Sequence, residues 1–140
     1  MSVCVLDCSV AAAWLFDDEA DPETDALLAR VAEEGAMVPN LWHLEVANVL
    51  RQAERRGRIS AAQVNAGLEA LSELPIHIDT ETAARAFRDV VALARAHDLT
   101  TYDAAYLELA LRSGVPLATR DRALLTAART VDLPAALANP

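Results

Sequence analysis

Short apolar runs alternate with longer amphipathic segments along this chain. The runs are four or five residues long and rich in valine, isoleucine and small residues. Such runs are typical of strands that are buried on both faces of a parallel sheet. The predicted strands are residues 3–7, 36–39, 75–78, 115–119 and, as a weaker fifth candidate, 130–133.

The segments between these runs have apolar residues at helical spacing and carry the residues that begin and end helices. Ser9 and Ser60 stand where N-caps are expected, and Gly35 and Gly114 stand where helices should stop. The predicted helices are residues 10–16, 26–35, 41–58, 61–74, 80–99, 100–114 and 120–128.

Strands that alternate with helices require crossover connections, which produce a mostly parallel sheet with helices on both faces. We therefore expect an α/β fold with a central sheet of four to five short strands. A chain of 140 residues with 54% hydrophobic content suits one domain over residues 1–140. Charged residues interrupt the apolar stretches before the ~20 residues that a membrane span needs, so a soluble cytoplasmic protein is expected.

The net charge of -9 argues against a general surface for polyanions. The chain contains no lysine, and all of its positive side chains are arginines. Binding of nucleic acid would therefore depend on a local arginine patch and on bound cations.

Four acids stand where a site is expected in such a fold, because sites of open parallel sheets lie beyond the carboxyl ends of the strands. Asp7 ends the first predicted strand, and Asp121 follows the fourth. Asp103 lies in the first turn of the preceding helix, while Glu45 interrupts an apolar helix and shares a face with Asn48. Each acid also has a structural explanation, as a helix cap, a partner of the helix dipole or a solvent-facing residue.

We hypothesise that the four acids converge, because hydroxyl residues such as Ser9 and Thr119 accompany them. Unit charges ~4 Å apart repel by roughly 4 kcal/mol at an effective dielectric near 20, so such a cluster needs compensation. A hard divalent cation, Mg²⁺ or Mn²⁺, suits an oxygen-only site. It could generate hydroxide from water and neutralise charge on a phosphodiester.

Two groups of arginines are candidates for contacts with an RNA backbone. The densest positive patch consists of Arg51, Arg55, Arg56 and Arg58. Arginines in a last helical turn also complement the helix dipole, which is a sufficient structural explanation. Arg120 and Arg122 flank Asp121 and could pair with it or with phosphate.

Four motifs in this order resemble the PIN-domain ribonucleases, specifically the VapC-type toxins of bacterial toxin–antitoxin pairs. They are "VLDCSV", "VPNLWHLEVANVL", "LTTYDAAYLELA" and "LATRD", and the resemblance covers nearly the whole chain. It implies a three-layer α/β/α sandwich and a Mg²⁺-dependent endoribonuclease that is restrained by a small VapB-type antitoxin. It also implies a homodimer.

The resemblance further assigns roles to the site residues. Asp7 and Asp103 would be the principal metal ligands, and Glu45 and Asp121 would complete the acidic pocket. Ser9, Thr119 and Asn48 would support them by positioning ligands or water.

The expected reaction is in-line attack by a metal-activated water on a phosphodiester, with Glu45 or Asp121 orienting the water. Other enzyme classes fit less well: a haloacid dehalogenase phosphatase needs an acid at the position of Ser9, and a receiver domain needs a lysine. A PIN-like binding or assembly module without catalysis stays open as the alternative. The RNA target is not specified by these motifs.

Overall fold

The computed structural model describes residues 2–138 and contains one parallel sheet. Its strands are β1 (Val5–Leu6), β2 (Ala36–Val38), β3 (Ile76–Ile78) and β4 (Leu117–Ala118), in the order β3-β2-β1-β4. In the central strand β1, Val5 is in register with Met37 on one side and with Leu117 on the other. The predicted parallel sheet is confirmed.

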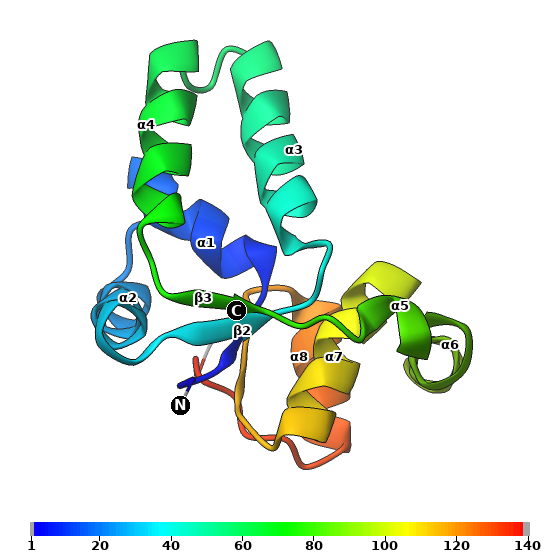
Figure 1. Cartoon of the computed structure of the whole chain (residues 1–140). Helices are drawn as coiled ribbons and strands as arrows, with labels where there is room; N and C mark the ends of the chain where they lie inside the picture. Colours follow the sequence, from blue (N-terminus) through cyan, green and yellow to red (C-terminus); the bar gives the residue numbers. More distant parts are fainter. Residues whose placement is uncertain (1, 139–140) are drawn as a thin grey trace.

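Helices cover both faces of this sheet (Figure 1). They are α1 (Cys8–Leu15), η1 (Asp17–Glu19), α2 (Pro22–Glu34), α3 (Trp42–Arg55), α4 (Ala61–Ser72), α5 (Thr82–Arg85), η2 (Ala86–Val90), α6 (Val91–His97), α7 (Thr101–Ser113) and α8 (Arg122–Thr130). Helix α1 contacts α2 and α3, and α3 forms a hairpin with α4. Helix α7 packs on β1, β4, α6 and α8, which completes the predicted three-layer α/β/α arrangement.

Local capping signals set most helix boundaries. Ser60 accepts a hydrogen bond from the backbone of Gln63 in a reciprocal capping box, and Thr100 caps α7. The prediction that Ser9 caps the first helix is wrong. Asp7 occupies the N-cap position, and Ser9 is the second residue of the helix. The Ser9 hydroxyl donates to the Asp7 carboxylate at 2.6 Å.

Two segments near the second half of the chain differ from the expected elements. The helix predicted over 80–99 is interrupted by the π-helical turn η2, which separates α5 from α6. The weaker strand predicted over 130–133 does not form, because α8 continues to Thr130 and Asp132 adopts a left-handed φ of 56°. After this turn, Ala135 pairs with Leu117 of β4 in an isolated parallel β-bridge.

The core lies between the sheet and the two helical layers. Leu6 of β1, Leu50 of α3 and Leu107 of α7 are among its largest fully buried side chains. Cys4 and Cys8 are free thiols, as expected, and burial raises the pKa of Cys4 to about 12. Within residues 2–138, every helix is too short or too polar to traverse a lipid bilayer.

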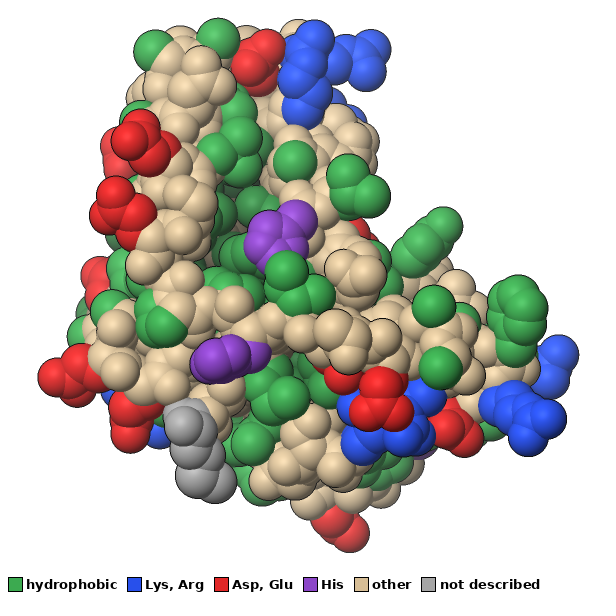
Figure 2. Space-filling model, viewed as in Figure 1, with side chains coloured by type: hydrophobic (Ala, Val, Ile, Leu, Met, Phe, Trp, Pro, Cys, Tyr) green, Lys and Arg blue, Asp and Glu red, His purple; other side chains and the backbone are tan. Residues whose placement is uncertain are grey.

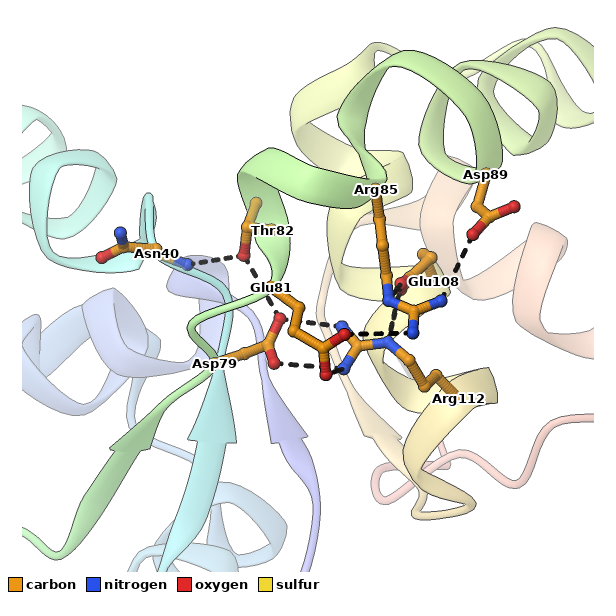
Figure 3. Close-up of polar contacts among 8 residues, drawn as sticks. All are labelled: Asn40, Asp79, Glu81, Thr82, Arg85, Asp89, Glu108 and Arg112. Atoms are coloured by element: carbon orange, nitrogen blue, oxygen red, sulfur yellow. Dashed lines mark hydrogen bonds and ion pairs between the residues drawn. The ribbon is translucent and has the colours of Figure 1, made fainter.

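An ion network fixes the C-terminal half of α7 to the loop after β3 (Figure 3). Arg112 donates to Asp79 Oδ2 and to Glu108 Oε1, each at 2.8 Å, and Arg85 Nε lies 3.5 Å from the same oxygen of Glu108. The side chains of Asp79 and Glu108 are 8% and 7% exposed, so both are buried acids with a guanidinium partner. We call these residues the Arg112 network; it joins α5, α7 and the sheet.

Candidate active site

The strand order reverses beside β1, which is where ligand sites form in open parallel sheets. The chain passes from β1 through β2 to β3 on one side and returns to β4 on the other. Asp7 follows β1, and its backbone N–H donates to the carbonyl of Ala118 at 2.9 Å. Asp7 and the residues after β4 therefore lie together at this switch point.

Two hydroxyl groups hold the Asp7 carboxylate. Ser9 and Thr119 donate to its Oδ2 atom at 2.6 Å and 2.8 Å, so neither of them occupies Oδ1. The backbone N–H of Arg120 donates to Ser9 Oγ at 2.9 Å and fixes that hydroxyl in turn. Burial raises the pKa of Asp7, the two hydroxyls oppose this effect, and the charge of Asp121 adds to it.

Asp121 caps helix α8 and also lies close to Asp7 and Asp103. Its Oδ2 atom accepts from the backbone N–H of Leu124 at 2.8 Å and caps α8. Its own N–H donates to the hydroxyl of Thr119 at 2.9 Å. The capping explanation is confirmed for Asp121, yet its charge still raises the pKa of both Asp7 and Asp103.

Asp103 enters the site from the first turn of α7, where its backbone N–H donates to Thr100 Oγ1 at 3.1 Å. The pKa of Asp103 is raised to about 6, first by burial and then by the negative charges of Asp7 and Asp121. The carboxylate is therefore destabilised in its charged form even though it lies at a helix N-terminus.

Glu45 enters from α3, and Tyr106 of α7 holds it. The Tyr106 hydroxyl donates to Glu45 Oε1 at 2.5 Å. Burial raises the pKa of Glu45, this hydrogen bond opposes the shift, and the charges of Asp7 and Asp103 add to it. Tyr106 was not among the predicted site residues, although its position three residues after Asp103 places the two on one face of the helix.

The negative charges of Asp7, Asp103 and Asp121 act on one another, and those of Asp7 and Asp103 act on Glu45; we call these four residues the acid edge. Within the described part of the chain, no three His, Cys, Asp or Glu side chains form a ready-made metal cage. Mg²⁺ commonly uses only one or two carboxylates and completes its shell with water and substrate phosphate. The oxygen-only donors and uncompensated charges of the acid edge fit such a water-rich site.

Several candidate residues lie outside the acid edge. Asn48 is exposed, and Arg51 pairs with Glu54 at 2.8 Å on the surface of α3. Arg55 and Arg56 line a hollow of about 370 Å³ at the far end of the same helix. Figure 2 shows basic side chains gathered there, at the top of the molecule.

The arginines beside Asp121 have separate environments. Arg120 does not bond with Asp121; its Nη1 atom donates to the backbone carbonyl of Glu19 at 3.1 Å. Arg122 is exposed. A hollow of about 520 Å³ opens between Asp121, Arg120 and Arg58, directly beside the acid edge. Arg58 was predicted only as one member of the basic patch at the end of α3.

Comparisons with known proteins agree with this architecture. The PIN domain family model matches residues 4–130. Ribonuclease VapC3 from Pyrobaculum aerophilum is 33% identical over 120 residues, which cover 86% of this chain and 90% of that protein. Ribonuclease VapC1 from Mycobacterium tuberculosis is 33% identical over 123 residues, with coverage of 86% and 90%.

Two solved structures resemble the whole arrangement. The crystal structure of PAE2754 from Pyrobaculum aerophilum superposes with a TM-score of 0.68 at 27% identity, covering 90% of this chain and 79% of that one. A chain of a toxin–antitoxin complex from Klebsiella pneumoniae has a TM-score of 0.55 at 22% identity and coverage of 84% and 86%, which is a likeness of fold. The family match over residues 4–130, with relatives of this similarity, shows that the chain belongs to the PIN domain family and to its VapC-type group.

Proposed function

We propose that this protein is a Mg²⁺-dependent endoribonuclease that acts as the toxin of a type II toxin–antitoxin pair. The observation that carries the proposal is the acid edge at the switch point of the sheet, where the pKa values of Asp7, Glu45 and Asp103 are raised by burial and by neighbouring negative charge. The relatives named Ribonuclease VapC support RNA as the substrate.

Asp7 and Asp103 would hold the metal ion, with Glu45 and Asp121 at its periphery; Mn²⁺ suits the same oxygen ligands. When bound, the ion would supply a water of lowered pKa and neutralise charge that develops on the phosphodiester. The carboxylate of Asp7 is held at Oδ2 by two hydroxyls, so its orientation is fixed before any ligand arrives.

The chain's own residues would then orient the attacking water. Tyr106 occupies Glu45 Oε1, which leaves Oε2 to accept a hydrogen bond from that water. Asp121 uses Oδ2 for its helix cap and has its other oxygen for the same purpose. Attack would form a new phosphorus–oxygen bond in line with the one that breaks; the nearby carboxylate would receive the proton of the water, and the leaving ribose oxygen would take up a proton.

Digestion of total RNA by purified protein, followed by mapping of the new ends, tests this proposal. We expect discrete cleavage with Mg²⁺ or Mn²⁺, none in EDTA, and none by an Asp7→Asn variant. Full activity in EDTA would contradict metal dependence, and equal cleavage by wild type and variant would show contamination or a wrong site.

A PIN-like module that binds RNA or protein without catalysis is the second candidate. It is favoured by the lack of a three-ligand metal cage within residues 2–138. The same digestion discriminates the two functions, because a binding module would create no new RNA ends at any metal concentration. Such a module would still shift RNA in a gel-shift assay.

We also propose that Arg51, Arg55, Arg56, Arg120 and Arg122 contribute contacts with the RNA backbone. For the α3 group, replacing Arg55 and Arg56 with alanine should weaken RNA binding severalfold and reduce its salt dependence. Unchanged affinity and salt dependence would remove these two residues from the proposal.

A VapB-type antitoxin and a second copy of this chain are the proposed protein partners. The toxin–antitoxin complex that shares this fold supports the antitoxin by analogy.

A dimer is supported by three large apolar side chains at the surface. Phe87, Leu44 and Tyr102 have exposures of 94%, 79% and 63%. We take these three side chains as the candidate contacts of a dimer, and light scattering of wild type beside Phe87→Glu would test for one.

A further inference from the structure

The hollow beside the acid edge is lined by two arginines in addition to Asp121. This space of about 520 Å³ is lined by residues that include Ser9, Arg58, Arg120 and Asp121. The two arginines come from the turn between α3 and α4 and from the loop after β4, which are far apart in the sequence. Positive charge is therefore available next to the candidate reaction centre.

Arg58 is held in a fixed orientation. Its guanidinium carbon lies 3.8 Å from the centre of the Phe16 ring, a stacking geometry that sets the plane of the group. Its Nη2 atom donates to Asp18 Oδ1 at 2.7 Å and to Glu19 Oε2 at 2.9 Å. Both bonds use the same nitrogen, so Nη1 and Nε are left for another anion.

Arg120 is connected to the same short helix. Its guanidinium donates to the backbone carbonyl of Glu19, while its backbone N–H donates to Ser9 Oγ. Helix η1 thus contacts both arginines of the hollow. The side chains of Asp18 and Glu19 accept from Arg58, and the backbone carbonyl of Glu19 accepts from Arg120.

We propose that Arg58 and Arg120 form a binding subsite for an RNA phosphate next to the scissile bond, and that Asp18 and Glu19 occupy Arg58 when RNA is absent. The inference rests on the proposed ribonuclease function and deepens it. Asp18 and Glu19 are 72% and 34% exposed, and pairs of this kind are weak and exchange readily. A phosphate of the substrate can replace the carboxylates because guanidinium binds both groups through the same donors.

The subsite also explains how a chain of net charge -9 could bind RNA. The acidic residues of η1 neutralise Arg58 in the free protein, and their displacement would expose its positive charge only when a phosphate is present. Asp121 of the acid edge lines the same hollow, so a phosphate bound there would align the neighbouring phosphodiester with the carboxylates.

Binding of a fluorescent single-stranded RNA to the Asp7→Asn protein, measured over a range of salt concentrations, tests the subsite. We expect Arg58→Gln and Arg120→Gln each to weaken binding by about tenfold and to reduce the slope of log affinity against log salt by about 0.7. Arg30→Gln is the matched control, because it removes one surface arginine from α2, and it should change neither quantity.

A second variant tests the exchange at Arg58 without touching the arginine. Asp18→Asn combined with Glu19→Gln should strengthen RNA binding severalfold, because the competing carboxylates are gone while Phe16 still orients the guanidinium. Weaker binding by this variant, with an unchanged melting temperature, would overturn the proposed exchange.

The outcomes separate this inference from the function on which it rests. Wild-type cleavage of RNA together with unaltered binding by Arg58→Gln and Arg120→Gln would overturn the subsite alone. A wild-type protein that neither binds nor cleaves RNA would overturn the proposed function and the subsite together. Loss of binding to a protein partner with RNA binding intact would assign the arginines to that partner and overturn the subsite.

Discussion

The two ends of helix α7 contain acids in opposite electrostatic situations. At its N-terminal end, Asp103 faces Asp7 and Asp121, and its pKa is raised to about 6. At its C-terminal end, Arg112 bonds both Glu108 and Asp79, and the hydrogen bonds from Arg112 lower the pKa of Asp79.

The difference separates a stabilising cluster from a functional one. In the Arg112 network each buried carboxylate has a guanidinium partner, which is how proteins tolerate buried charge. Within residues 2–138, the acid edge has hydroxyls and a phenol as partners but no cation among them. Clusters of like charge that a fold maintains at a cost in stability are typical of sites that bind a cation or perform chemistry.

The strongest test of this distinction is Asp7→Asn. We expect it to reduce RNA cleavage by about a thousandfold or more, because a metal ligand supplies several kcal/mol of transition-state stabilisation. The asparagine oxygen can still accept from Ser9 and Thr119, and the repulsion with Asp121 disappears, so the melting temperature should not fall. A cleavage assay beside a thermal melt measures both, and a large loss of stability would show that Asp7 is structural.

Arg112→Leu should have the opposite signature. It leaves Asp79 and Glu108 buried without their partner, which should reduce the free energy of unfolding by about 3 kcal/mol. Denaturant titration measures the loss, with Arg30→Leu as a control at an exposed ion pair. A triple variant with leucine at positions 79, 108 and 112 should restore the free energy of unfolding, because it removes all three charges. A triple variant as unstable as Arg112→Leu would show that the loss does not come from unpaired carboxylates.

Tyr106→Phe sharpens the comparison inside the acid edge. It removes the hydroxyl that holds Glu45 Oε1 but keeps the ring in the core. Cleavage should fall by about tenfold, as for other residues that orient a catalytic group. The pKa of Glu45 should rise further, which a pH–rate profile would record; a rate and profile identical to wild type would exclude this positioning role.

The two clusters also predict opposite dependence of stability on pH. The pKa of Asp103 is about 6 in the folded chain against an ordinary value of 3.8, so between these values the folded state binds more protons than the unfolded state. Without metal, the melting temperature should therefore rise as the pH falls from 7 toward 5. Asp79 has a lowered pKa, so its contribution is present above its ordinary pKa and is lost as the pH falls below that value.

Melting curves in EDTA from pH 7 to pH 3 measure both effects. Asp103→Asn should flatten the rise between pH 7 and pH 5 and leave the loss at lower pH in place. Added Mg²⁺ should stabilise the wild type more at pH 7 than at pH 5, because protons compete for the same carboxylates. Identical curves for wild type and Asp103→Asn would refute the raised pKa.

Much of the fold was predictable because its signals are local. The capping box at Ser60 and the left-handed glycine at Gly114 are encoded within a few residues, and the structure confirms both. Asp132 shows the limit of such signals, since its left-handed turn ends the extended run that hydrophobicity alone predicted over 130–133. Ser9 shows a second limit of local signals, because a serine suits both the N-cap and the first turn of a helix. In this protein Asp7 occupies the N-cap position.

The sequence by itself determined that strands alternate with helices and that an acid follows β1 and another follows β4, since periodicity and chain order fix these features. Only the tertiary structure decided which side chains meet. Tyr106 bonds Glu45 across 61 positions, Arg58 bonds Asp18 across 40, and Arg112 bonds Asp79 across 33. Contacts between such distant residues depend on how helices pack on the sheet, and that packing is set by the whole core rather than by any local pattern.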